Sequence, residues 1–170
     1  SANVSLVLSM GRLPQTLHAL SNMENAGVKV VNTPSSVALC CNRRQLNNVL
    51  KAAGIPLAPE KGEHGYWLKR ADGVAESSGD VQYAADEVEA QAKETQMREA
   101  GVDDVLVCAH VPGDLIKFYG VRDTDFFRYY YPGDEGKWKF SDEARNGIPQ
   151  HFPFSGNELH AISDKAAAAA

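Results

Sequence analysis

Cysteine and long apolar runs are scarce in this chain of 170 residues. Its three cysteines, Cys40, Cys41 and Cys108, provide neither a disulfide framework nor the ligand spacing of a zinc site. We interpret them as reduced thiols of a cytoplasmic protein. No apolar run approaches the roughly 20 residues that a membrane-spanning helix needs, and no secretory signal is visible at the start.

Basic charge is also in short supply, because the formal net charge is -5 at pH 7. The chain therefore has no cationic surplus to hold nucleic acid or an anionic membrane by bulk charge. We expect no nucleic-acid and no membrane partner, and a homo-oligomer is left open. Any anion site must be local, built from a few Lys, Arg and backbone N–H groups. The five histidines show no metal-ligand spacing, and no Ser–His–Asp triad has a recognisable context.

What the chain does contain is ordinary for a soluble globular protein, with 44% hydrophobic and 23% charged residues. The pattern predicts strands over Val4–Met10 and Val28–Asn32 on either side of a helix over Gln15–Asn25, which is the length of a βαβ crossover. Two strands do not make a doubly wound sheet alone. Either they are the tail of a longer domain, or a partner chain completes them.

The middle of the chain predicts two helices around one strand. The first helix runs over Val37–Ala53, with Thr33 or Ser35 as its N-cap and Arg43 in its interior, where a solvated helix face is the alternative role. The strand is Gly65–Arg70, the polar loop Ala71–Asp80 follows it, and Val81–Ala100 is predicted to be helical.

The stretch Val105–Val121 predicts an apolar strand, a turn at Pro112-Gly113 and a second strand led by Asp114. A further strand, Phe126–Tyr131, returns after a turn, and a short one is expected over residues 137–140. Lys117 and Arg128 each lie within an aromatic strand, so they could reach a common ligand. The alternative is an edge hairpin that charged side chains protect.

Four segments occur in an order that resembles the ATP-grasp superfamily, in particular its ribosomal-protein glutamate ligase, glutathione synthetase and D-alanine ligase type. They are Asn42-Arg43, Gly65–Lys69, Ser77–Gly79 and Val107–Asp114, and the resemblance covers roughly residues 4–131. It implies a mixed α/β and α+β chain with the ATP-grasp fold, in which two α+β subdomains grip ATP after the end of an α/β pre-grasp domain.

The resemblance also implies domain boundaries. Residues 1–32 would be the end of the pre-grasp domain, 33–104 the N-terminal grasp subdomain and 105–165 the start of the C-terminal one. Residues 166–170 are a run of alanines that we interpret as placeholders. The chain is accordingly expected to be incomplete.

The resemblance assigns nucleotide contacts to particular positions. Arg43 would reach the phosphates, although the family usually has a lysine after an acid where this chain has Asn42-Arg43. Lys69 would hold the α- and β-phosphates. The loop that closes over the phosphates would comprise Ser77, Ser78 and Gly79.

The base and the ribose would be bound by the hinge after the strand. Cys108, Ala109, His110 and Val111 match this hinge, with the Ala109 carbonyl accepting from the adenine amino group and the Val111 N–H donating to the ring. The acid usual in this hinge is absent. Asp114 matches the acid that binds the ribose hydroxyls.

The function implied is an ADP-forming ligase that uses ATP and Mg²⁺ to join a small-molecule or peptide carboxylate to an amine through an acyl phosphate. Lys117 and Arg128 are the candidates for contacting the transferring phosphate or the carboxylate. The metal ligands are unassigned, because Asp142, Glu143 and Asn146 have suitable side chains in an unsuitable context. The alternatives are a non-catalytic nucleotide-binding or scaffold module, a small-molecule kinase on the same fold, and an unrelated α+β domain.

Overall fold

The computed structural model describes residues 4–136, 138 and 141–170, so most of the strand expected over residues 137–140 lies outside it. The strands are β1 (Leu6–Leu8), β2 (Lys29–Val31), β3 (Tyr66–Arg70), β4 (Val81–Ala84), β5 (Val105–Ala109), β6 (Lys117–Gly120) and β7 (Phe127–Tyr130). The α-helices are α1 (Pro14–Asn25), α2 (Pro34–Cys41), α3 (Arg43–Ala52), α4 (Glu87–Glu99) and α5 (Gly156–Ala169). None of the helices in this described part is long and apolar enough to cross a membrane.

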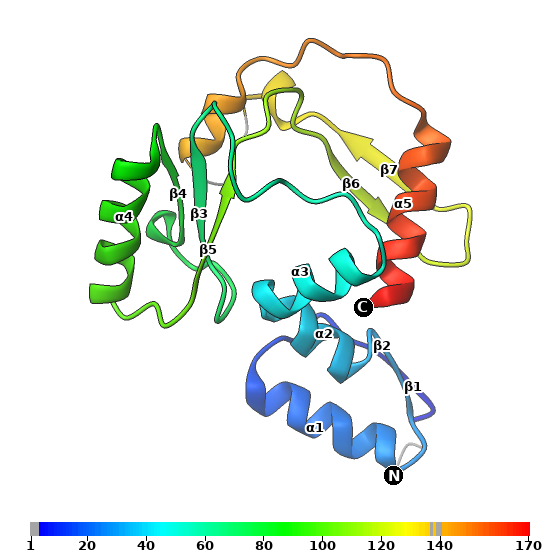
Figure 1. The fold of residues 1–170 in the computed structure, drawn as a ribbon. Coiled ribbons are helices and arrows are strands. Elements are labelled where there is room, and N and C mark those ends of the chain that lie inside the picture. The colour runs from blue at the N-terminus through cyan, green and yellow to red at the C-terminus, as the bar shows by residue number, and fades with distance from the viewer. Residues whose placement is uncertain (1–3, 137, 139–140) are drawn as a thin grey trace.

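The strands form three small sheets (Figure 1). β1 pairs parallel with β2 across α1, so the expected βαβ unit is confirmed. The central sheet is antiparallel with the order β4-β3-β5. β6 and β7 form the expected antiparallel hairpin, in which Lys117 lies opposite Tyr130 and Tyr119 opposite Arg128.

The central sheet has two different faces, because successive side chains of a strand point to opposite sides. One face packs against α4, and its fully buried Leu68 lies in a cluster with Val105 and Met97. The other face carries Trp67 and Lys69, which lie opposite Cys108 and Leu106 of β5. Lys69 and its neighbour Arg70 therefore point to opposite sides of the same sheet.

The helix expected over Val37–Ala53 is two helices, so that prediction was wrong. The chain leaves helical geometry at Asn42, whose φ is -99° and ψ 97°, and the Asn42 side-chain oxygen accepts a hydrogen bond from the Gln45 N–H at 2.9 Å. Asparagine is a favoured N-cap, so it begins a second helix. Arg43 consequently lies in the first turn of α3 and not in a helix interior.

The helix expected over Val81–Ala100 was wrong in its first four residues, which form β4. Val81 and Ala84 are buried in the sheet, and this packing overrides the helical pattern of the sequence. The helix begins only after Asp86, whose carboxylate accepts from the Glu89 N–H at 2.8 Å as the N-cap of α4.

The two strands expected on either side of Pro112-Gly113 do not pair with each other. β5 pairs with β3, whereas β6 pairs with β7. The segment through Gly113, whose φ of 142° suits glycine, therefore connects two sheets. Figure 1 shows the central sheet with α4 on one side of the molecule, and the β6–β7 hairpin beside α5 on the other.

Candidate anion-binding site

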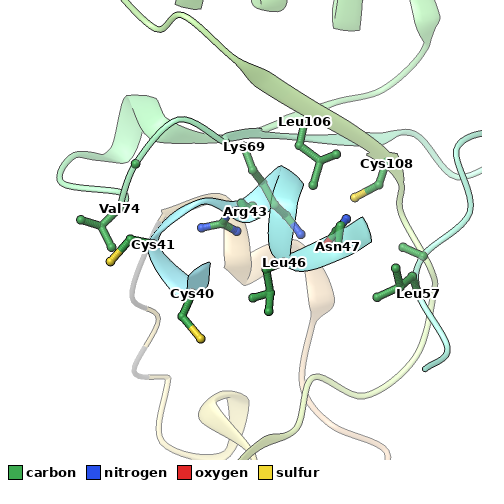
Figure 2. Close-up of a pocket in the computed structure, with 12 residues that line it drawn as sticks. Cys40, Cys41, Arg43, Leu46, Asn47, Leu57, Lys69, Val74, Leu106 and Cys108 are labelled. Carbon is green, nitrogen blue, oxygen red and sulfur yellow. The ribbon is translucent and has the colours of Figure 1, made fainter. Parts of the chain in front are cut away.

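A cavity of about 350 Å³ lies between α2, α3 and the face of the central sheet that α4 leaves open. Figure 2 shows its lining, with Lys69 extending from β3 and Arg43 and Asn47 from α3. All three cysteines also line it, and all three are free thiols. We name it the α3 cavity. It brings together Arg43, Lys69 and Cys108, three residues that the sequence proposes for nucleotide binding.

The charge balance of the α3 cavity is one-sided. Arg43 and Lys69 line it, and none of the described Asp or Glu residues does. Within the part of the chain that the structure describes, neither cationic group makes a hydrogen bond or ion pair with a side chain. Burial lowers the pKa of Arg43, and the nearby Cys108 acts in the opposite direction. Two partly buried cations without a counter-ion attract an anion, since burying an uncompensated charge is unfavourable.

The local structure holds the two cations on neighbouring elements. The Arg43 N–H donates to the Ala71 carbonyl at 3.0 Å, which connects the start of α3 to the residue that follows β3. The next residue, Arg44, has a different role. Its guanidinium donates from Nε and Nη2 to the two carboxylate oxygens of Asp104, both at 2.6 Å, and from Nη2 to the Val105 carbonyl at 2.8 Å.

A second cavity, of about 320 Å³, lies between the loop before β4 and the end of α4, and we name it the α4 cavity. Ser77 and Gly79 line it with Arg70 and Asp80. The Asp80 carboxylate accepts from the N–H of Glu76 at 3.0 Å, and from the N–H and hydroxyl of Ser77 at 2.8 and 3.0 Å. The Ser77 donors that the ATP-grasp resemblance assigns to phosphate are thus hydrogen-bonded to the Asp80 carboxylate.

Asp80 is only 6% exposed and lies 3.2 Å from Arg70 Nε. Its burial alone would raise its pKa, but the N–H groups of Ser77 and Glu76, the Ser77 hydroxyl and Arg70 together hold the pKa below its usual value. Asp80 is therefore ionised at neutral pH and neutralises Arg70.

The hinge residues are placed as the end of β5 and the start of the following segment. Of the four, Cys108 alone lines the α3 cavity. The Ala109 N–H donates to the Pro59 carbonyl and the His110 N–H to the Gly65 carbonyl, both at 2.8 Å. The Val111 side chain is 57% exposed.

The His110 ring lies against Trp67 on the sheet face next to this hinge. Its Nδ1 lies 3.0 Å from Trp67 Nε1, which is a donor only, so Nδ1 accepts and the neutral ring carries its proton on Nε2. Burial lowers the pKa of His110, and the charges of His64 and Arg145 lower it further. The neutral form is therefore favoured.

Asp114 lies outside both cavities. Its carboxylate accepts from the N–H groups of Gln150 and Phe152 at 2.7 and 2.9 Å. Burial acts to raise its pKa, but these backbone N–H groups and the charge of His151 keep it low. In this structure Asp114 holds the segment before α5, and its expected contact with ribose remains a prediction.

Lys117 and Arg128 share one face of the β6–β7 hairpin because of the register between the two strands, but they line neither cavity. Lys117 pairs with Glu143 at 3.4 Å. The Arg128 guanidinium donates to the Phe127 carbonyl at 2.8 Å and lies 5.6 Å from the centroid of the Phe126 ring. Their catalytic roles are untested by this geometry.

The described residues contain no preformed cluster of metal ligands. Across residues 4–136, 138 and 141–170, no group of three His, Cys, Asp or Glu side chains could hold a metal ion. Asp142 instead accepts from the Tyr83 N–H at 2.9 Å, and Glu143 pairs with Lys117.

Sequence reasoning missed Asn47 and Asp104. Asn47 lies four residues after Arg43, and this helical spacing is a signal that would have placed both on one face of α3. Nothing in the sequence pairs Arg44 with Asp104, since 60 residues separate them.

Comparisons with known proteins give matches in structure only, because no protein-family model and no curated protein matches the chain. A RimK domain ATP-grasp protein from Sphaerobacter thermophilus matches with a TM-score of 0.65 and 14% identity over 98% of this chain. The D-alanine-D-alanine ligase from Coxiella burnetii matches with a TM-score of 0.55 and 17% identity over 75% of this chain.

The chain has the ATP-grasp fold. The VanG D-Ala:D-Ser ligase from Enterococcus faecalis is also similar, with a TM-score of 0.54 and 14% identity over 99% of this chain. The expected ATP-grasp architecture is thereby confirmed. The chain spans only 43%, 64% and 57% of the lengths of the Coxiella, Sphaerobacter and Enterococcus proteins, respectively.

Proposed function

We propose that the α3 cavity binds the phosphate groups of ATP. The observation that carries this proposal is the pair of cations, Arg43 and Lys69, which line one cavity without any carboxylate. A guanidinium is a planar fork that suits two phosphate oxygens, whereas an ammonium acts as a point charge. The two groups would divide the phosphate chain between them.

The reaction we propose joins a carboxylate to an amine. The γ-phosphoryl group of ATP passes to the substrate carboxylate, which gives an acyl phosphate and ADP. The amine then attacks the acyl carbon and releases phosphate. Protein assistance to such transfers comes mainly from positioning and charge neutralisation, and these are what Arg43 and Lys69 would supply. Two of the structural neighbours are named as ligases of D-amino acids, which supports this class of chemistry for the fold.

Lys117 and Arg128 would contact the acidic substrate. They lie on the same face of the β6–β7 hairpin as Tyr119 and Tyr130, whose rings stack with centroids 6.2 Å apart. This face combines the Arg128 guanidinium, and Lys117 paired with Glu143, with the exposed aromatic surface of Tyr119 and Tyr130, which are 58% and 45% exposed. A small-molecule or peptide carboxylate matches that chemistry. Domain boundaries at 32/33 and 104/105 and a cytoplasmic location belong to the same proposal.

A nucleotide-binding module without catalysis is the second candidate. The engagement of the Ser77 donors by Asp80 favours it, because the N–H and hydroxyl of Ser77 are not free to bind a phosphate in this conformation. A small-molecule kinase on this fold would share the first phosphoryl transfer and differ in its acceptor.

Calorimetric titration with ATP, with and without Mg²⁺, tests the binding proposal. Wild type is expected to bind ATP, and Lys69→Ala to bind it far more weakly. Hydroxylamine added with a panel of carboxylic acids then traps an acyl phosphate as a hydroxamate. Hydroxamate formation supports the ligase, whereas ATP binding without ADP release across the panel supports the module. Absence of ATP binding by wild type contradicts both.

A further inference from the structure

Asp104 occupies a junction between the elements that carry the two cations. Its carboxylate accepts both hydrogen bonds of the Arg44 fork at 2.6 Å, and its carbonyl accepts from the Ala71 N–H at 2.8 Å. The Ala71 carbonyl in turn accepts from the Arg43 N–H at 3.0 Å. Asp104 is thus hydrogen-bonded to α3 through Arg44 and to the end of β3 through Ala71. The Arg43–Ala71 hydrogen bond connects these two elements directly.

The α3 cavity requires such a restraint between α3 and β3. Arg43 and Lys69 carry like charges that repel each other when no anion lies between them. Without a restraint, the start of α3 would move away from the sheet in the free protein, and ligand binding would have to bring the cations together again. A site that is already in its bound geometry avoids that loss of affinity.

The Arg44–Asp104 pair has the geometry that this restraint requires. The two parallel hydrogen bonds of a guanidinium–carboxylate fork fix orientation as well as distance. The hydrogen bond from Arg44 holds the pKa of Asp104 below its usual value, although burial opposes this. The pair is therefore ionised at neutral pH. Arg44 Nη2 also donates to the Val105 carbonyl, which adds β5 to the junction.

We propose that Asp104 is a positioning residue for anion binding in the α3 cavity, acting through Arg44 and Ala71 to hold Arg43 beside Lys69. This inference rests on the proposed function for its ligand. For the removal of the Asp104 charge, this proposal predicts a change in anion affinity opposite in sign to the one that simple electrostatics predicts. Removing a negative charge near an anion site should strengthen anion binding, whereas removing a positioning carboxylate should weaken it.

Isothermal titration with inorganic pyrophosphate at fixed ionic strength separates these outcomes. Asp104→Asn is expected to weaken pyrophosphate binding about tenfold, a loss of preorganisation. The matched control is Asp103→Asn, which removes the same charge one residue away from an exposed side chain outside the junction. It should leave the affinity unchanged or slightly higher.

A second variant holds net charge constant. Arg44→Lys keeps the cation but loses the planar fork, so electrostatics predicts no change and positioning predicts weaker binding. Circular dichroism establishes that each variant is folded. Amide exchange at Arg43 gives a readout that needs no ligand, and it should accelerate in Asp104→Asn and in Arg44→Lys but not in Asp103→Asn.

Different experimental results would overturn the positioning role of Asp104 and the proposed function. If wild type binds pyrophosphate and both junction variants bind it as tightly, the positioning role is overturned and the proposed function stands. If wild type binds neither pyrophosphate nor ATP, the proposed function fails, and with it the ligand that Asp104 would serve. Unchanged Arg43 amide exchange in both variants overturns the junction itself, whatever the ligand.

Discussion

Lys69 and Arg70 are consecutive residues of β3, and they enter cavities with opposite charge balance. Lys69 lines the α3 cavity, where Arg43 adds a second cation and the lining residues that the structure describes include no carboxylate. Arg70 lines the α4 cavity together with Asp80, whose carboxylate lies 3.2 Å from Arg70 Nε. Asp72, which is not part of the cavity lining, lies 3.4 Å from the same atom. The comparison shows that the acids around a cation decide its role. Arg70 is a structural ion-pair partner, whereas Lys69 is available to a ligand.

The same contrast recurs at Arg43 and Arg44, the first two residues of α3. Arg44 is held by Asp104, and Arg43 faces the α3 cavity without an acidic partner among the described residues. In both pairs, a cation neutralised within the fold lies beside one that is not. Each pair therefore supplies an internal control for experiments on the other member.

The largest expected effect is loss of anion binding when both cations of the α3 cavity are removed. Arg43→Ala with Lys69→Ala should abolish the thermal shift that pyrophosphate gives wild type, because hydrogen bonds to charged groups contribute about 1.5–3 kcal/mol each. Lys61→Ala with Arg98→Ala removes the same charge from the surface. If that control loses the shift equally, binding is non-specific and the contrast between the cavities fails.

Next in size is the loss of stability when the acid of the α4 cavity is removed. Asp80→Ala leaves the donors of Glu76 and Ser77 without their acceptor and removes one of the two carboxylates near Arg70, which should lower the free energy of unfolding by about 2 kcal/mol. Urea denaturation measures it. Glu76→Ala in the same loop should change stability by less than about 0.5 kcal/mol. An Asp80→Ala protein as stable as wild type would show that this carboxylate is not structural.

A smaller effect follows from making the α3 cavity resemble the α4 cavity. Asn47→Asp introduces a carboxylate of nearly the same shape beside the two cations, and should weaken pyrophosphate binding by about 1 kcal/mol, several-fold. Asn48→Asp makes the same change at the next, exposed position of α3. Equal losses from both substitutions would mean that only net charge matters.

The smallest effect concerns pH. The pKa of Asp80 is lower in the folded state than its ordinary value, so its stabilising contribution is complete at neutral pH and is lost as the pH falls below about 4. The difference in unfolding free energy between wild type and Asp80→Asn should therefore shrink between pH 7 and pH 3. A difference that is constant over this range would contradict the ionised Asp80–Arg70 pair.

Local pattern predicted the strand that carries Lys69, because alternation along a strand is a property of the backbone. It also placed Lys117 and Arg128 within aromatic strands, whereas their shared face follows from the register between β6 and β7. The ATP-grasp resemblance, and not local pattern, selected Arg43, and the sequence placed this residue inside a helix that in fact breaks at Asn42. The Asn42 cap could have been predicted from residue type alone. The Ser77-to-Asp80 capping box could have been predicted in the same way, and it would have indicated that the Asp80 carboxylate binds the donors of this loop.

Other parts of the site could not have been read from the sequence. The Arg44–Asp104 fork joins residues far apart in the chain, and only the packed fold brings them together. β4 forms because Val81 and Ala84 fit a buried sheet position that overrides local helical preference. Asp114 meets the N–H groups of Gln150 and Phe152 only through the path of the chain before α5.

The most direct test of the central claim compares the two neighbours on β3. ATP is titrated calorimetrically into wild type, Lys69→Ala and Arg70→Ala, each verified as folded. The account predicts that Lys69→Ala weakens ATP binding at least about tenfold, the loss of one charge-assisted phosphate contact, while Arg70→Ala binds ATP as wild type does. Equal losses in the two variants, or unchanged binding in Lys69→Ala, would contradict it.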